Sequence, residues 1–271
     1  MEHLLHIAAN ATLEAGGEIM RIYDDPRQDF EIEMKSDKSP LTRADKAAHK
    51  CIVRHLSETG IPILSEEGAH LPYEERKEWH RLWVVDPLDG TKEFIKKNGE
   101  FTVNIALIED GKPVLGVIYV PATEILYAGI EGVGAWRVEN AKNLLRAQKS
   151  IKEREPLMLR HLPIPSTAQR MDFTIVASRS HKNPETEHFI NLMRKQHGKV
   201  QLISSGSSLK ICHVAEGNAD IYPRFAPTME WDTAAGDAIA RAAGREVVDA
   251  KTGEPLVYNK PDLHNPWFIV R

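Results

Sequence analysis

The stretch Leu82–Phe94, LWVVDPLDGTKEF, constrains the fold more than any other part of the chain. An apolar run of β-forming residues is interrupted by Asp86 and Asp89, which stand three positions apart. Pro87 fixes its own φ angle and Gly90 permits a close approach of the backbone, so the segment predicts a tight turn. Such a turn delivers both carboxylates to one side, where two like charges repel each other at the end of a buried strand.

This repulsion is relieved if a cation lies between the two carboxylates. The candidate ligands are all carboxylates, and no His/Cys pair has the spacing of a zinc site, so the oxygen ligands indicate Mg²⁺. Leu88, between the aspartates, can offer only its backbone carbonyl. Gly90 and Thr91 open a short helix, TKEFIKK, whose first N–H groups predict a phosphate site. The turn therefore predicts a phosphoryl group held between a metal ion and a helix N-terminus.

Composition and charge limit the class of partner. The chain has 271 residues and a formal net charge of −4, so there is no electrostatic reason to expect a nucleic acid polymer as the ligand. No uninterrupted apolar run approaches the ~20 residues that cross a bilayer, and the N-terminus lacks the pattern of a signal peptide. We expect a cytoplasmic protein without a transmembrane segment. Peripheral association at the inner membrane, and the choice between monomer and homodimer, stay open.

The periodicity of the apolar residues differs between the two halves of the chain. The first half mixes amphipathic helices, over about 4–22 and 41–56, with antiparallel strands. Asp110–Gly111 separates two β-branched runs and predicts a hairpin. From Phe173 onward, strands and helices alternate as in an α/β unit.

The stretch from Lys142 to Asp172 is polar, contains prolines and has little periodicity, so it predicts a boundary between two lobes. We expect an N-terminal α+β lobe over residues 1–145 and a C-terminal α/β lobe over residues 146–271. The acidic turn falls in the first lobe.

Further carboxylates stand at the ends of other predicted elements. They are Asp45 in the first turn of a helix, Glu66 and Glu67 after the strand IPILS, and Asp232 at the start of the helix WDTAAGDAIARAAG. Each has a structural alternative. Asp45 would complete a capping box with Thr42, Asp232 would cap its helix, and the glutamates would lie in a solvated loop. Together they fit a multi-metal phosphatase better than unrelated caps, because two metals can bridge a phosphate and activate a water.

Three motifs, in this order along the chain, resemble one known family. SEEG at Ser65–Gly68, DPLDGT at Asp86–Thr91 and WDTAAGDA at Trp231–Ala238 are similar to the signatures of the lithium-sensitive, magnesium-dependent phosphatases that include inositol monophosphatase. The resemblance covers nearly the whole chain. It implies the sugar-phosphatase fold, layered α-β-α-β-α, which agrees with the mixed first half and the alternating second half.

The same resemblance implies a role for each acidic residue. The metal ligands would be Glu66, Asp86, the Leu88 carbonyl, Asp89 and Asp232, and they would hold two or three Mg²⁺ ions. Asp45 and Thr91 would be the catalytic pair that orients the nucleophilic water, and Glu67 would lie behind the ligands. Of the ligands, Glu66, Leu88, Asp89 and Asp232 would also contact the substrate, together with Gly90 and Thr91.

Motifs of the second half are similar to the 3'(2'),5'-bisphosphate nucleotidase branch of that family. ASRSH ends at His181, GSSLK runs from Gly206 to Lys210, and YPRF contains Arg224. The likeness implies that the ribose and the second phosphate of a nucleotide meet His181, Ser207, Lys210 and Arg224. Lys and Arg suit a phosphate that an inositol monophosphate lacks. The structural alternatives are solvated surface charges for Lys210 and Arg224 and a purely structural histidine at 181.

The expected activity is Mg²⁺-dependent hydrolysis of the 3'-phosphate of adenosine 3',5'-bisphosphate to AMP, with the sulfated nucleotide as a further substrate. Such an enzyme would clear a by-product of sulfate activation. One alternative is an inositol monophosphatase or another sugar phosphatase on the same fold, which would show no preference for a bisphosphate. A second alternative is a non-catalytic regulator that senses a phosphorylated ligand, which would bind tightly without turnover.

Overall fold

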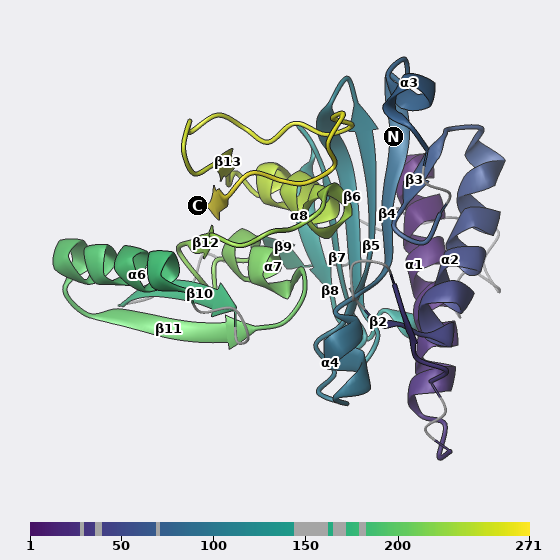
Figure 1. Ribbon diagram of the computed structural model, residues 1–271, viewed down its shortest axis with the longest axis horizontal. Helices are drawn as coiled ribbons and strands as arrows, with labels where there is room; N and C mark the ends of the chain where they lie inside the picture. The colour runs from purple at the N-terminus through teal and green to yellow at the C-terminus, as the bar shows by residue number, and fades with distance from the viewer. Residues whose placement is uncertain (28–29, 36–39, 69–70, 144–161, 165–171, 179–182) are drawn as a thin grey trace.

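The computed structural model describes residues 1–27, 30–35, 40–68, 71–143, 162–164, 172–178 and 183–271 (Figure 1). Its helices are α1 (Glu2–Tyr23), α2 (Arg43–Leu56), the 3₁₀ turn η1 (Ser57–Thr59), α3 (Tyr73–Arg76), α4 (Thr91–Ile95), α6 (Pro184–His197), α7 (Leu209–Ala215) and α8 (Glu230–Ala242). Within these described residues, no helix is long and apolar enough to cross a membrane.

In the described part of the chain, the strands form one large sheet and three small ones. The large sheet has the order β3-β4-β5-β6-β7-β8-β9, and its strands are β3 (Ile63–Ser65), β4 (Arg81–Asp89), β5 (Thr102–Glu109), β6 (Lys112–Val120), β7 (Ile125–Ile130), β8 (Gly134–Val138) and β9 (Leu162–Ile164). The smaller sheets contain β1 (Glu33–Met34), β2 (Pro40–Leu41), β10 (Phe173–Ser178), β11 (Val200–Ser205), β12 (Tyr222–Arg224), β13 (Val247–Asp249) and β14 (Phe268–Val270). In the large sheet, β3 runs parallel to β4, and each further neighbour is antiparallel.

The elements stack in the expected α-β-α-β-α order (Figure 1). Helices α1 and α2 pack on one face of the large sheet, and α8 with α7 beside it covers the other face. Beyond α7 lies the parallel pair β10–β11, and α6 forms the outermost layer. The predicted layering is therefore confirmed.

Local sequence signals explain the boundaries of α2 and of the β5–β6 hairpin. The hydroxyl of Thr42 accepts a hydrogen bond from the N–H of Ala44, and the carboxylate of Asp45 accepts one from the N–H of Thr42. This capping box begins α2 where the sequence indicated. Asp110 and Gly111 both have positive φ angles, 47° and 77°, which the two-residue hairpin turn requires.

Two glycines allow α8 to pack very close to the large sheet. A Cβ atom on Gly116 of β6 would lie 2.2 Å from the carbonyl oxygen of Ala235, and one on Gly129 of β7 would lie 2.8 Å from the Cα atom of Ile239. The α8 residues at this contact are largely alanines, such as Ala238, so the backbones of helix and sheet approach each other directly. This contact fixes the position of the first turn of α8.

The predicted division after residue 145 stays a proposal, because it falls within residues 144–161, outside the described part of the chain. The large sheet draws elements from both sides of this division. Strand β9 pairs with β8, and α8 packs against β4 to β8.

Gly116→Ala tests the contact between α8 and the sheet. The added methyl group overlaps the Ala235 carbonyl, so we expect a loss of about 1–3 kcal/mol in the free energy of unfolding, measured by urea denaturation. Gly17→Ala in α1 is the matched control. A Cβ at Gly17 meets no atom within 4 Å, so this change should leave stability unchanged or raise it by about 0.4–1 kcal/mol. Equal stability of the two variants would contradict the proposed role of Gly116.

Candidate active site

The structure brings together three carboxylates from opposite halves of the chain. One oxygen each of Asp86, Asp89 and Asp232 lies within 4.8 Å of the other two. Asp86 and Asp89 come from the end of β4, where the pairing with β5 shifts register between them, and Asp232 comes from the first turn of α8. The irregular Asp-Pro-Leu-Asp segment and the close packing of α8 thus place these acids at one point.

The surroundings of Asp86 and Asp232 oppose the ionisation of these two carboxylates. Asp86 is only 1% exposed, and its pKa is raised by burial and by the charges of Glu66, Asp89 and Asp232. Burial, and to a smaller extent the negative charge of Asp89, raises the pKa of Asp232 to about 8. The side chain of Asp232 also accepts a hydrogen bond of 2.8 Å from the N–H of Met229. Asp232 is the third residue of α8, so the structural alternative that made it the N-cap is wrong; Met229 is the N-cap, and Asp232 caps the N–H of Met229 from within the first turn.

The donor set fits a hard divalent cation. The three side chains offer carboxylate oxygens, which Mg²⁺ prefers, and a cation among them would offset both the repulsion and the loss of hydration. Leu88 lies between the two aspartates of β4, and its N–H donates to Asp86 at 3.0 Å. This hydrogen bond orients one oxygen of Asp86 and helps to hold the turn.

Lys35 contacts the two glutamates that follow β3, Glu66 and Glu67. This lysine was not identified from the sequence. Its Nζ atom lies 2.8 Å from Glu66 Oε1 and also contacts the carboxylate of Glu67. Burial favours the neutral amine, but the charges of Glu66 and Glu67 outweigh it and raise the pKa of Lys35. Burial also raises the pKa of Glu66, whose charge in turn acts on Asp86. The structural alternative of a solvated loop is wrong, because the side chains of Glu66 and Glu67 are only 25% and 10% exposed and both are paired with Lys35.

Asp45 uses its two oxygens for two different tasks. Oδ2 accepts hydrogen bonds from the N–H and the hydroxyl of Thr42, at 2.7 and 2.6 Å, and so completes the cap of α2. Oδ1 accepts a hydrogen bond of 3.2 Å from the hydroxyl of Thr91. Burial raises the pKa of Asp45. The structural and the catalytic interpretation of Asp45 are therefore compatible, because each concerns a different oxygen.

Gly90 links the acidic turn to α4. It has a φ of 93° and is the N-cap of this short helix, and a Cβ there would lie 3.2 Å from both the Glu100 carbonyl and Ser207 Cβ. The Thr91 hydroxyl that follows lies 3.4 Å from the Leu88 carbonyl. Glycine thus turns the chain sharply enough to bring Thr91 back toward Asp45.

A cavity of about 140 Å³ opens beside Asp89 and Asp232. Its lining includes Gly90, Ser207, Lys210, Tyr222 and Arg224. Residues from the turn after β4, from the segment between β11 and α7, and from β12 therefore share one pocket with the acidic cluster.

Lys210 and Arg224 are the cationic residues of this cavity. Lys210 is 7% exposed, its Nζ donates to the Ser207 carbonyl at 2.6 Å, and burial lowers its pKa to about 8. Arg224 donates to the Pro227 carbonyl, but its buried Nε has no hydrogen-bond partner among the described residues. The alternative of a solvated surface charge is wrong for Lys210. His181 lies outside the described residues, so its predicted role has no structural counterpart here.

Ser208 forms hydrogen bonds with two aspartates of the acidic cluster, and Asn104 donates a hydrogen bond to Ser208. Neither residue was identified from the sequence. Ser208 Oγ lies 2.8 Å from Asp89 Oδ2 and 2.9 Å from the carbonyl of Asp232. The amide of Asn104, on β5, donates to Ser208 Oγ at 2.9 Å. Serine and asparagine occur in many loops and strands, so only the three-dimensional arrangement distinguishes these two.

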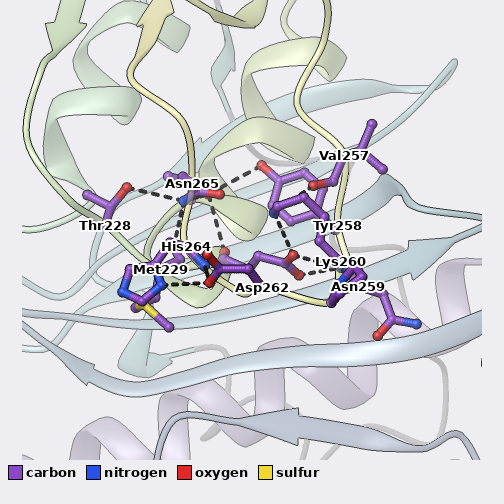
Figure 2. Close-up of polar contacts among 12 residues, drawn as sticks. Thr228, Met229, Val257, Tyr258, Asn259, Lys260, Asp262, His264 and Asn265 are labelled. Atoms are coloured by element: carbon purple, nitrogen blue, oxygen red, sulfur yellow. Dashed lines mark hydrogen bonds and ion pairs between the residues drawn. The ribbon is translucent and has the colours of Figure 1, made fainter. Parts of the chain in front are cut away.

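The segment from Val257 to Asn265 holds the first turn of α8 (Figure 2). The side-chain amide of Asn265 donates to the Met229 carbonyl at 2.7 Å and to the hydroxyls of Thr228 and Thr233. The fully buried carboxylate of Glu230 accepts from the Nζ of Lys260 at 2.6 Å and from two backbone N–H groups of the same segment. These bonds fix the turn that carries Asp232.

The comparisons with known proteins agree with this arrangement. The inositol monophosphatase family profile matches residues 1–266. The 3'(2'),5'-bisphosphate nucleotidase CysQ of Escherichia coli K12 is 43% identical over 273 residues, with 100% of this chain and 98% of the relative covered. The CysQ protein of Salmonella typhimurium is 45% identical with the same coverage.

Solved structures show the same fold. The crystal structure of CysQ from Bacteroides thetaiotaomicron, described as a bacterial member of the inositol monophosphatase family, is 54% identical and superposes with a TM-score of 0.91 over 100% of this chain and 97% of that one. The inositol monophosphatase of Thermotoga maritima, at 23% identity and a TM-score of 0.71 over 100% of this chain and 92% of that one, shares the fold. Profile, relatives and structures together establish that the chain belongs to the inositol monophosphatase family.

Proposed function

We propose that this protein is a Mg²⁺-dependent phosphatase that removes the 3'-phosphate of adenosine 3',5'-bisphosphate to give AMP and phosphate, and that it also accepts the sulfated nucleotide. The observation that carries the proposal is the single cavity in which Lys210 and Arg224 lie beside the acidic cluster. A substrate with two phosphates needs a cationic site in addition to the site of hydrolysis. The full-length relatives named as 3'(2'),5'-bisphosphate nucleotidases support the same substrate class.

The proposed ligands of two or three Mg²⁺ ions are Glu66, Asp86, the Leu88 carbonyl, Asp89 and Asp232. When bound, Mg²⁺ supplies Lewis acidity that activates water and stabilises negative charge on a phosphate. The ligands Glu66, Leu88, Asp89 and Asp232 would also contact the substrate. Lys35, beside Glu66 and Glu67, offsets part of the negative charge on this side of the cluster.

Asp45 and Thr91 are the proposed catalytic pair. The Thr91 hydroxyl donates to Asp45 Oδ1, so its oxygen lone pairs are free to accept a hydrogen bond from a water. A water oriented this way directs its own lone pair toward the phosphorus. Its oxygen forms the new P–O bond as the bond to the ribose 3'-oxygen breaks, and its proton is drawn toward Thr91 and Asp45. The 3'-oxygen leaves as a hydroxyl after taking a proton from solvent.

On the nucleotide side, we propose that Gly90, Ser207, Lys210 and Arg224 contact the substrate. The unpartnered Nε of Arg224 and the ammonium of Lys210 are suited to the second phosphate. Ser207 lies in the left-handed region, with a φ of 41°, and its hydroxyl pairs with that of Thr102 at 3.1 Å. His181 stays a proposed contact to the ribose, without a structural description.

We infer that the enzyme works in the cytoplasm on a by-product of sulfate activation. Monomer and homodimer are both compatible with a cavity lined by one chain. Cell fractionation tests whether any of the protein associates peripherally with the inner membrane.

The substrate class is tested by measuring phosphate release from adenosine 3',5'-bisphosphate and from inositol 1-phosphate side by side. With Mg²⁺ we expect a strong preference for the bisphosphate, with loss of activity on adding a chelator and inhibition by millimolar Li⁺. Preference for the inositol phosphate would favour a sugar phosphatase with the same site. Tight binding of both compounds without turnover would favour the regulator.

Asp86→Asn tests the proposed metal site. The change removes one negative charge from a repulsive cluster, so the metal-free variant should unfold at a temperature equal to or above that of the wild type. Turnover should fall at least about a hundredfold, and Mg²⁺ should no longer raise the unfolding temperature as it does in the wild type. Near-normal turnover would exclude Asp86 as a ligand. Asp110→Asn, at the distant hairpin, is the matched control and should keep full activity.

Lys210→Met tests the contact with the second phosphate, because methionine keeps most of the buried volume and removes the charge. We expect KM for adenosine 3',5'-bisphosphate to rise about tenfold to a hundredfold, the usual cost of losing a hydrogen bond to a charged group. KM for adenosine 3'-monophosphate, which lacks the 5'-phosphate, should change little. Equal changes in KM for the two substrates would exclude a contact between Lys210 and the 5'-phosphate.

A further inference from the structure

Three potential metal ligands gather between α1 and α2, outside the acidic cluster. Glu14 of α1 and Cys51 and His55 of α2 each offer a donor atom, and the three atoms lie within 4.8 Å of one another. Cys51 and His55 are four residues apart on one helix, so they share a face, and Glu14 reaches His55 Nε2 at 3.1 Å from the neighbouring helix. A thiol, an imidazole and a carboxylate are the side chains that zinc takes in proteins.

One nitrogen atom marks the point on which these donors converge. Nη2 of Arg54 lies 2.7 Å from Glu14 Oε2, 3.3 Å from His55 Nε2 and 3.7 Å from Cys51 Sγ. A single cationic group thus touches all three donor atoms. The Arg54 side chain is 65% exposed, and ion pairs at such positions are weak because water competes for both partners. A divalent cation therefore has only a weak competitor at this point.

We propose that Glu14, Cys51 and His55 form a binding site for Zn²⁺ or a similar borderline-soft divalent cation, which displaces Arg54. Mg²⁺ binds sulfur and imidazole poorly, so this site and the all-carboxylate cluster select different metals. The location favours a cation as well. Cys51 and His55 lie in the last turns of α2, where the carbonyl groups of the helix end carry partial negative charge.

The two sites are well separated. Asp45 lies in the first turn of α2 and His55 in the last, so the two residues are ten positions apart, about 15 Å along the helix axis. Helices α1 and α2 run side by side on the face of the large sheet opposite α8 (Figure 1). An ion held between them would tie these two helices together and stabilise the fold without entering the reaction.

Binding requires three local changes. Arg54 turns toward solvent, and the Cys51 thiol releases its proton to the buffer while a sulfur lone pair forms the bond to the metal. The donor atoms then adjust to roughly 3.3–3.8 Å from one another, the separation that tetrahedral zinc with its usual bond lengths requires. The fourth position is left to water.

Co²⁺ is a suitable probe, because it takes zinc sites and reports its ligands by absorption. The full-length protein is treated with chelator, saturated with Mg²⁺ and titrated with Co²⁺. We expect a thiolate-to-cobalt charge-transfer band in the near ultraviolet, visible bands of tetrahedral Co²⁺, and loss of both on adding Zn²⁺. Zn²⁺ should also raise the unfolding temperature in the presence of saturating Mg²⁺.

Variants identify the ligands. The chain has two cysteines, both buried and unpaired, so Cys51→Ala should abolish the charge-transfer band and the matched Cys212→Ala should keep it. His55→Gln, at a partly exposed position, should weaken Co²⁺ binding at least about tenfold and serves as the test if Cys51→Ala does not fold. Arg54→Ala should tighten binding by up to about fivefold, because it removes the competing cation.

Three results would overturn the proposal: a wild-type titration without a thiolate band, a band that persists in Cys51→Ala, or weaker binding by Arg54→Ala. None of these measurements depends on phosphatase activity, so the result is independent of the proposed substrate.

Discussion

The close contact between α8 and the large sheet determines where the acidic cluster forms. Asp86 and Asp89 belong to one turn, but Asp232 comes from the other half of the chain and reaches them only because α8 is seated against Gly116 and Gly129. Larger side chains at these two glycines would hold the helix farther from the sheet. The alanine-rich sequence of α8 and the two glycines of the sheet therefore serve the site as much as the core.

Assembling the cluster costs stability, and neighbouring groups offset only part of the cost. Asp86 and Asp232 have raised pKa values because they are poorly hydrated and close to like charges. A folded-state pKa above the unfolded value means that the metal-free protein loses stability as the pH rises toward about 8 and Asp232 ionises. Lys35 and Ser208 contribute compensating contacts at the edges of the cluster. A cation bound among these carboxylates would therefore raise the stability of the folded protein, as expected of a binding site whose charged groups repel each other when it is empty.

Much of the fold and part of the site could be predicted from the sequence, because the relevant signals are local. The capping box at Thr42, the hairpin at Asp110–Gly111 and the acidic turn each depend on residues close together in the chain. The contacts of Lys35 and Ser208 could not be predicted, since each meets partners at least 24 positions away through a residue type common on protein surfaces. Asp45 illustrates a different limit. The sequence offered a cap or a catalytic residue as alternatives, whereas the geometry assigns one carboxylate oxygen to each.

Asn265 and Lys260 clamp the first turn of α8 through their hydrogen bonds to Met229 and Glu230. These bonds affect the order of events during translation. The ribosome makes the acidic turn of β4 early, Asp232 much later and these two clamp residues later still. A nascent chain that has already formed most of the large sheet therefore still lacks a fixed Asp232. We expect cation binding to the carboxylates to begin only after these residues have been synthesised and have fixed the first turn of α8.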